Sequence, residues 1–268
     1  MPDDQFLGLR AAAYAALAAG TARAAVFEHA GRRFVAKAPG RGRGWLEAWF
    51  VKLFCRIVLG YRVPLEPLRL VNGQTRLEHE ATRLSILAAA GEAVPQVLLL
   101  EPGCLVLEYV GHTVEESLHP LPHGQYEAFL LPILDDLRRF HAAGHWHGGA
   151  QVKNLTLQEG RLYRIDLEED VGAHLPLALM HALDLVLFVN SCTLLCDMNE
   201  ADSLALASAL FMRYLQTPPD PLVCEMLAKG QRSLSNACAL LAPLRHRGGR
   251  SLRRVFILRD ALGAALEG

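Results

Sequence analysis

The sequence predicts an α+β protein with two lobes, a small lobe built from a sheet and helices and a larger, mainly helical lobe. Three observations lead to this prediction. Residues 1–110 contain short apolar runs separated by turn residues, with one strong helical pattern among them. Beyond residue 175 the apolar periodicity is almost wholly helical. Since the pattern changes near Gly111, we predict a smaller lobe over 1–110 and a helical lobe over 111–268.

The first half contains each element of the predicted small lobe. Residues 5–19 are rich in alanine and favour a helix that Gly20 ends. A further helix is predicted over Arg76–Ala90 and ends at Gly91, and Leu77, Leu84 and Leu87 share one of its faces. The predicted strands, which are apolar runs flanked by turn residues, are Ala24–His29, Arg32–Ala38, Val94–Leu100 and Leu105–Val110.

The second half begins with a linker at Gly111–Thr113 and continues with helices around one hairpin. The predicted strands of the hairpin are Leu155–Leu157 and Leu162–Ile165. The predicted helices, all with apolar faces, are Val114–Leu118, Gln125–Ala143, 175–198, 201–215, 220–242 and 250–266.

Composition excludes several broad classes. With 51% hydrophobic and 21% charged residues, the chain is expected to bury a core. A formal net charge of −1 gives no bias toward nucleic acid, so no nucleic-acid partner is expected. No run of about 20 uncharged apolar residues is present. Asp3 and Asp4 lie where a signal peptide would be basic. Six scattered cysteines suit free thiols, and together these features predict a cytoplasmic protein.

The segment Trp45–Tyr61 supports two interpretations. It is the most hydrophobic predicted helix, with two tryptophans and two phenylalanines beside basic residues. Such a helix can pack on its neighbours, or it can lie in a membrane interface. The second interpretation predicts a peripheral contact with the inner membrane. The preceding loop, PGRGRG at 39–44, is basic and glycine-rich but lacks the context of a phosphate-binding loop.

The stretch from His141 to Asp166 concentrates the residues that suggest chemistry. A helix ends at a glycine, a His-Gly-Gly loop follows, and Asn154 and Asp166 lie at either end of the predicted hairpin. Phosphoryl transfer from ATP needs a lysine on the phosphates, an acid that holds this lysine, and oxygen ligands for Mg²⁺. Lys37, Glu80, Asn154 and Asp166 supply these groups in that order. Local roles compete with this interpretation, because Asn154 could stabilise its own turn and Asp166 could cap a helix.

These residues resemble the motifs of the protein-kinase-like superfamily, in particular its lipopolysaccharide-kinase, RIO and Bud32-like branch. FVAK at 34–37 matches the strand of the phosphate-binding lysine. HAAGHWHGG at 141–149 matches the catalytic loop, and IDLE at 165–168 matches the metal-binding aspartate motif. Glu80 matches the glutamate that pairs with the lysine, with Glu78 as the alternative. The resemblance covers about residues 22–200.

The resemblance implies a bilobal kinase-like fold, ATP and Mg²⁺ as cofactors, and a role for each matching residue. Lys37 and Glu80 would position the phosphates, and Glu108 and Val110 would lie near the adenine. The metal ligands would be Asn154, Asp166 and Glu168. Asp184 would brace the catalytic loop.

The sequence departs from the family in three positions. Gly149 replaces the catalytic aspartate, no glycine-rich loop is visible between Ala22 and Glu28, and Glu168 replaces the last glycine of the metal motif. Gln151 could orient an acceptor, His147 could accept a proton, and Glu168 could bind metal or act as the base. His147 could instead be structural, because the relatives use that position to brace the loop. Two functions therefore follow from the resemblance. One is a phosphotransferase that acts on a lipopolysaccharide-type glycolipid or on a protein, and the other is a pseudokinase that binds nucleotide or a partner.

Overall fold

The structure is a computed structural model that describes residues 3–40, 45–62, 73–169, 172, 175–216, 220–245 and 249–267. The small lobe contains α1 (Asp3–Ala19), β1 (Ala24–His29), β2 (Arg32–Lys37), α3 (Gly73–Ala89), β3 (Val97–Glu101) and β4 (Cys104–Glu108). The helix α2 (Trp45–Val58) lies between β2 and α3 in the sequence but packs on the larger lobe, against α8. The chain continues with β5 (His112–Thr113), α4 (Val114–Leu118), α5 (Tyr126–Ala142), β6 (Leu155–Gln158) and β7 (Arg161–Arg164). It ends with α6 (Leu177–Cys192), α7 (Glu200–Gln216), α8 (Pro221–Leu241) and α9 (Arg250–Glu267).

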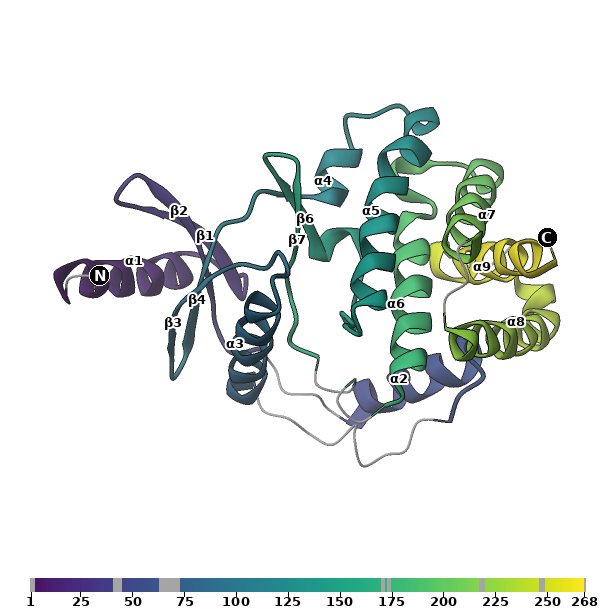
Figure 1. The fold of residues 1–268 in the computed structure, drawn as a ribbon, viewed down its shortest axis with the longest axis horizontal. Helices are drawn as coiled ribbons and strands as arrows, with labels where there is room; N and C mark the ends of the chain where they lie inside the picture. The colour runs from purple at the N-terminus through teal and green to yellow at the C-terminus, as the bar shows by residue number, and fades with distance from the viewer. Residues whose placement is uncertain are drawn as a thin grey trace.

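The larger sheet is antiparallel, with strand order β1-β2-β4-β3, and helices cover both of its faces (Figure 1). Alternate side chains of a strand point to opposite faces. Phe34 and Ala36 of β2 accordingly pack toward α1, together with Leu9 and Val106. Val35 faces the other way, toward the core that contains α3. This alternation directs Lys37, two residues beyond Val35, to the α3 face.

The larger lobe is helical apart from a small antiparallel sheet of order β5-β6-β7. In Figure 1, α5 and α6 run alongside each other, and α7, α8 and α9 lie on the side away from the larger sheet. Buried side chains of these helices form a continuous core with the α3 face of the larger sheet. The predicted α+β fold with two lobes is confirmed.

The segment 111–113 differs from the prediction, because the predicted linker contains a strand. His112 and Thr113 form β5 and pair with Leu157 and Thr156 of β6. The close approach depends on Gly111, whose φ is +92°. A Cβ there would lie 2.1 Å from the carbonyl oxygen of Leu157, so only glycine allows the strands to pair.

Two other boundaries also differ. The third strand begins at Val97 instead of Val94. The helix predicted over 175–198 ends at Cys192, because Leu194 and Cys196 adopt positive φ angles of 51° and 47°. Since left-handed backbone conformations at non-glycine residues are set by tertiary context, neither break had a local signal.

The helix α2 packs against α8 at its C-terminal end. Ser233 of α8 donates a hydrogen bond to the carbonyl oxygen of Arg56 at 2.8 Å. Cys55 and Val58 are buried, whereas Trp49 is 45% exposed. Among the described residues, no helix is both long enough and apolar enough to cross a membrane. Residues 41–44 of the PGRGRG loop lie outside the described residues.

Candidate active site

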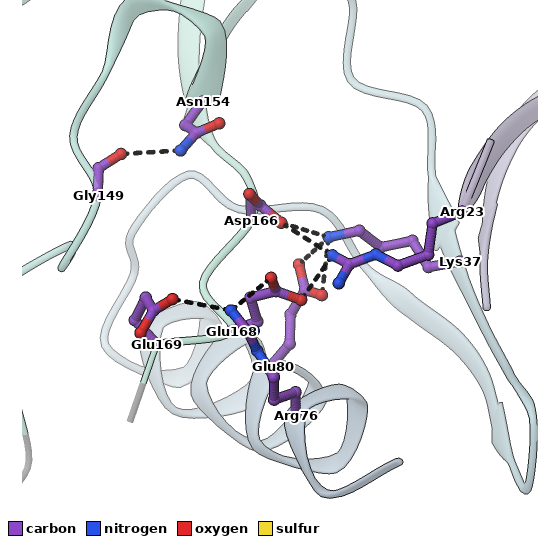
Figure 2. Close-up of polar contacts among 9 residues, drawn as sticks. All are labelled: Arg23, Lys37, Arg76, Glu80, Gly149, Asn154, Asp166, Glu168 and Glu169. Atoms are coloured by element: carbon purple, nitrogen blue, oxygen red, sulfur yellow. Dashed lines mark hydrogen bonds and ion pairs between the residues drawn. The ribbon is translucent and has the colours of Figure 1, made fainter. Parts of the chain in front are cut away.

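The centre of the site is a buried lysine held by two acids. Lys37 Nζ lies 2.7 and 2.8 Å from the two carboxylate oxygens of Glu80, and 2.9 Å from Asp166 Oδ1 (Figure 2). Burial acts to lower the pKa of Lys37, but the two carboxylates outweigh it and raise that pKa above its usual value. Lys37 is therefore a fixed cation that faces the beginning of the IDLE segment.

Glu80, and not Glu78, is the partner of Lys37. The carboxylate of Glu80 is fully buried on the face of α3 that meets the sheet, whereas Glu78 is exposed. Glu78 instead accepts a hydrogen bond from Gln74 at 3.1 Å. The apolar stripe of α3 explains the difference, because Leu77, Ala81 and Leu84 turn Glu80 inward with them.

Asp166 and Glu168 are held from the small lobe by two arginines. Arg23, directly before β1, donates to Glu168 Oε2 at 2.6 Å and lies 3.8 Å from Asp166 Oδ1. Arg76 of α3 lies 2.8 Å from Glu168 Oε1. Asp166 has a left-handed backbone with φ of +62°. Burial acts to raise the pKa of Asp166, but Lys37 and Arg23 hold it below its usual value.

The loop before β6 is fixed by backbone hydrogen bonds to a buried acid. Asp184 of α6 accepts the N–H groups of His147 and Gly148 at 2.6 and 2.8 Å. Gly148 has φ of +86°, a conformation that L side chains rarely adopt. Arg83 of α3 donates to the carbonyl oxygen of His147 at 3.0 Å and stacks on the ring of Trp146. The loop therefore keeps its shape without a side chain at position 149.

Asn154 and Asp166 have the donor atoms that Mg²⁺ prefers. The Asn154 amide donates through Nδ2 to the carbonyl oxygen of Gly149 at 2.9 Å, so its oxygen is the atom available to a cation. Oxygens of Glu80, Asp166 and Glu168 lie within 4.8 Å of one another. However, Arg23 and Arg76 engage both oxygens of Glu168. Asn154 and Asp166 therefore fit as ligands of a metal ion. Glu168 instead binds the two arginines.

A cleft of about 540 Å³ opens on one side of Asn154 and Asp166. Val26, Val35 and Leu107 form an apolar wall, and Lys37 lies at one end. Glu108 and Val110, the predicted adenine contacts, both line it. Its size and its apolar lining with a few charged groups are typical of small-molecule sites.

A second cavity of about 360 Å³ has the same two residues in its lining. Gly149 and Gln151 line it, and so do Lys153, Glu168 and Glu169. Its opposite wall is apolar and comes from α2, α6 and the segment before α6: Cys55, Leu175, Met180, Leu183 and Leu187.

His147 has two interpretations from the sequence, a candidate proton acceptor and a residue that braces the loop, and its burial favours the second. Its side chain is only 1% exposed and lines neither cavity. Burial lowers its pKa to about 4. Neither ring nitrogen has a hydrogen-bond partner among the described residues.

Arg23 and Arg76 were not predicted as site residues, although the sequence carries a signal for each. In the β1–β2 hairpin Ala24 pairs with Lys37, so the preceding Arg23 must lie near Lys37. Arg76 precedes Glu80 by four residues on a helix and shares its face.

The cleft, the buried Lys37–Glu80 pair and the braced loop define a kinase-like class of protein. No family model matches the sequence. The chain is 33% identical over 94 residues to the RIO-type serine/threonine-protein kinase Rio1 of Haloferax volcanii, an alignment of 32% of this chain. It is 32% identical over 142 residues, or 52% of its length, to a probable bifunctional tRNA threonylcarbamoyladenosine biosynthesis protein of Haloquadratum walsbyi.

These alignments span 31% and 24% of the two curated relatives, respectively. Together with the fold, they support membership of the protein-kinase-like superfamily. The activity and the acceptor of this chain are matters for proposal.

Proposed function

We propose that the chain is an ATP- and Mg²⁺-dependent phosphotransferase. The observation that carries this proposal is that two cavities meet at Asn154 and Asp166. In-line transfer needs the leaving oxygen and the attacking oxygen on opposite sides of the phosphoryl group. ATP in the larger cleft and an acceptor in the smaller cavity would satisfy this requirement.

Each residue has a role in this proposal. Lys37, held by Glu80, contacts the phosphates, while Glu108 and Val110 border the adenine. Asn154 and Asp166 hold Mg²⁺, which neutralises charge on the phosphates when it is bound. Gln151 lines the second cavity, where its amide can orient an acceptor hydroxyl.

The acceptor that fits best is a hydroxyl on a partly apolar molecule. The apolar wall of Leu175, Met180 and Leu187 suits an acyl or similar group, and Lys153 suits an anionic substituent. A lipopolysaccharide-type glycolipid has both features. Since Cys55 of α2 lines the same cavity, contact of the segment Trp45–Tyr61 with the membrane surface would bring such an acceptor close.

A pseudokinase is the second candidate, and Gly149 is the observation that favours it. Without a carboxylate at this position, the loop has no proton acceptor of its own. Nucleotide would then bind in the larger cleft without efficient transfer.

Calorimetric titration with ATP, with and without Mg²⁺, combined with a measurement of ADP release, separates the candidates. We expect Mg²⁺-dependent binding, together with turnover that falls about 100-fold or more in Asp166→Asn. The matched control is Asp197→Asn, because Asp197 is 98% exposed and distant from both cavities. Binding without turnover would support the pseudokinase. An absence of binding would exclude both candidates.

Two further experiments test the acceptor and the membrane contact. Phosphate transfer from labelled ATP to a purified lipopolysaccharide core, but not to casein, would support the glycolipid, whereas the reverse would support a protein. Flotation with anionic vesicles tests α2 directly. We expect flotation to be lost when Trp45 and Trp49 are both changed to Glu, and unchanged flotation would contradict the membrane contact.

A further inference from the structure

The replacement of the catalytic aspartate by Gly149 leaves the proposed reaction without a base on the loop. A base must therefore come from another part of the second cavity. Among the described residues, the carboxylates that line this cavity are Asp166, Glu168 and Glu169. The contacts of these three acids differ, and the differences allow a choice between them.

Asp166 and Glu168 already have other partners. Asp166 contacts Lys37 at 2.9 Å and is shared with the nucleotide cleft, where the proposed metal lies. Glu168 has one oxygen on Arg23 and the other on Arg76, and its side chain is 9% exposed. A proton on Asp166 would weaken its contacts with both Lys37 and Arg23, and a proton on Glu168 would weaken its contacts with both Arg23 and Arg76.

Glu169 is positioned differently. It lines only the second cavity, and its side chain is 31% exposed. In Figure 2, Glu169 and Gly149 both lie on the side of Asp166 away from Lys37. Two contacts fix Glu169: Arg76 donates to its Oε1 at 2.8 Å, and His79 Nε2 lies 3.2 Å from its carbonyl oxygen.

The backbone of the loop also comes close to this residue. A Cβ built on Gly148 would lie 3.4 Å from the Cβ of Glu169. The Glu169 side chain therefore begins next to Gly148. Its carboxylate faces Arg76 in the structure, and rotation about its side-chain bonds would turn it toward the space that a side chain at position 149 would occupy.

We propose that Glu169 is the catalytic base that replaces the missing aspartate, an inference that rests on the proposed phosphotransferase function. The acceptor oxygen forms a bond to the γ-phosphorus as the bond from that phosphorus to the β–γ bridging oxygen breaks. ADP leaves with the electron pair of the broken bond. The hydroxyl proton moves to the Glu169 carboxylate and then to water, which reaches this side chain. Arg76 holds the carboxylate before the transfer.

ATP hydrolysis by the full chain tests this inference, because water can replace the unidentified acceptor. We expect Glu169→Gln to lower kcat by about 10² to 10⁴, the usual contribution of a general base, with KM for ATP within about twofold. Glu127→Gln is the matched control, because Glu127 is exposed on α5 and lines neither cavity.

Introducing a carboxylate at position 149 distinguishes a Glu169 that acts as the base from a Glu169 that only stabilises the structure. Gly149→Asp should fit, because a Cβ there would have its nearest contact at 3.5 Å, with Asn154 Nδ2. In the Glu169→Gln background, Gly149→Asp should restore kcat at least tenfold. If the Glu169→Gln variant does not fold, Glu169→Asp is used in its place, and the expected outcomes are the same. Aspartate keeps a negative charge near Arg76, but its shorter side chain moves the carboxylate away from the acceptor.

The outcomes also separate this inference from the proposed function. Hydrolysis by the unmodified chain that is unchanged in Glu169→Gln overturns the role of Glu169 and leaves the phosphotransferase in place. A slow variant that Gly149→Asp does not rescue also overturns it, because Glu169 would then act only through Arg76. If the unmodified chain binds Mg²⁺ and ATP but releases no ADP, the proposed function fails and the inference fails with it.

Discussion

Lys37 and Glu80 form a two-point ion pair, with distances of 2.7 and 2.8 Å, across the interface between β2 and α3. Both side chains are buried, and Asp166 contacts the same ammonium from the segment after β7. The strand, the helix and the IDLE segment are thus joined at one ammonium group. The phosphotransferase proposal requires these three parts to be together.

The burial of this pair predicts a large effect on stability. Lys37→Met leaves the fully buried carboxylate of Glu80 without its main partner and should lower the free energy of unfolding by about 3–5 kcal/mol. The double variant Lys37→Met/Glu80→Leu should be more stable than the single one, because it removes both charges. Urea denaturation measures both changes.

The matched control is a pair with the same separation on the surface. Lys229 and Glu225 of α8 lie 2.7 Å apart and are exposed. Lys229→Met should cost at most about 1 kcal/mol. Equal losses for Lys37→Met and Lys229→Met would contradict the prediction.

The hydrogen bonds of Asp184 lead us to expect that this residue stabilises the loop before β6. It accepts two backbone N–H groups and is fully buried on α6. Asp184→Asn replaces one accepting oxygen by an amide N–H₂ that faces a donor, so we expect a loss of about 2–3 kcal/mol in unfolding free energy. Amide exchange at Gly148 should accelerate. Asp197→Asn, at an exposed position, should change stability by less than about 0.5 kcal/mol; a similar loss in both variants would argue against bracing by Asp184.

The sequence contained enough information to predict the central residues, because each has a local signature. Lys37 ends an apolar strand, Glu80 follows an apolar helical stripe, and Asp166 ends another apolar strand. The structure brings these three side chains into contact. Their roles in catalysis stay predictions.

Residues that depend on contacts between the lobes were harder to predict. Arg23 and Glu168 are 145 positions apart, and Arg76 and Glu169 are 93 apart. Nothing local to Glu168 shows that two arginines engage it. The strand at His112–Thr113 was missed for the same reason, since two residues become a strand only when β6 lies beside them.

Arg23 gives a prediction about ligand discrimination. Its guanidinium lines the nucleotide cleft between Lys37 and Glu168. Arg23→Met should weaken ATP binding about tenfold, equivalent to about 1.4 kcal/mol, because a charge-assisted contact to phosphate is lost. Adenosine has no phosphate, and its affinity should be unchanged. Calorimetry compares the two ligands, with Arg232→Met as the control, because Arg232 is exposed on α8 and lines neither cavity. An equal loss for adenosine would show a change in cleft shape instead.

The lowered pKa of His147 leads to a prediction of how the free energy of unfolding depends on pH. Burial lowers its pKa to about 4 in the folded chain, whereas an unfolded chain has the ordinary histidine value of about 6.5. Between these values the unfolded state binds the extra proton, so the free energy of unfolding falls as the pH falls from about 6.5 to 4. The full difference corresponds to about 3 kcal/mol. His181, whose pKa burial also lowers to about 4, acts in the same window.

Replacing His147 isolates its share of this dependence. His147→Gln cannot take up a proton, so the unfolding free energy measured by urea at pH 4.5 and pH 7 should differ less in the variant than in the unmodified chain. The remaining difference includes His181 and also Glu80, whose pKa burial raises and which therefore acts in the opposite sense. The carboxylates with lowered pKa, such as Asp184, act below the ordinary value of about 4. His119→Gln, at an exposed position, should leave the dependence as it was. An identical pH dependence in His147→Gln and the unmodified chain would mean that His147 becomes protonated without unfolding the loop.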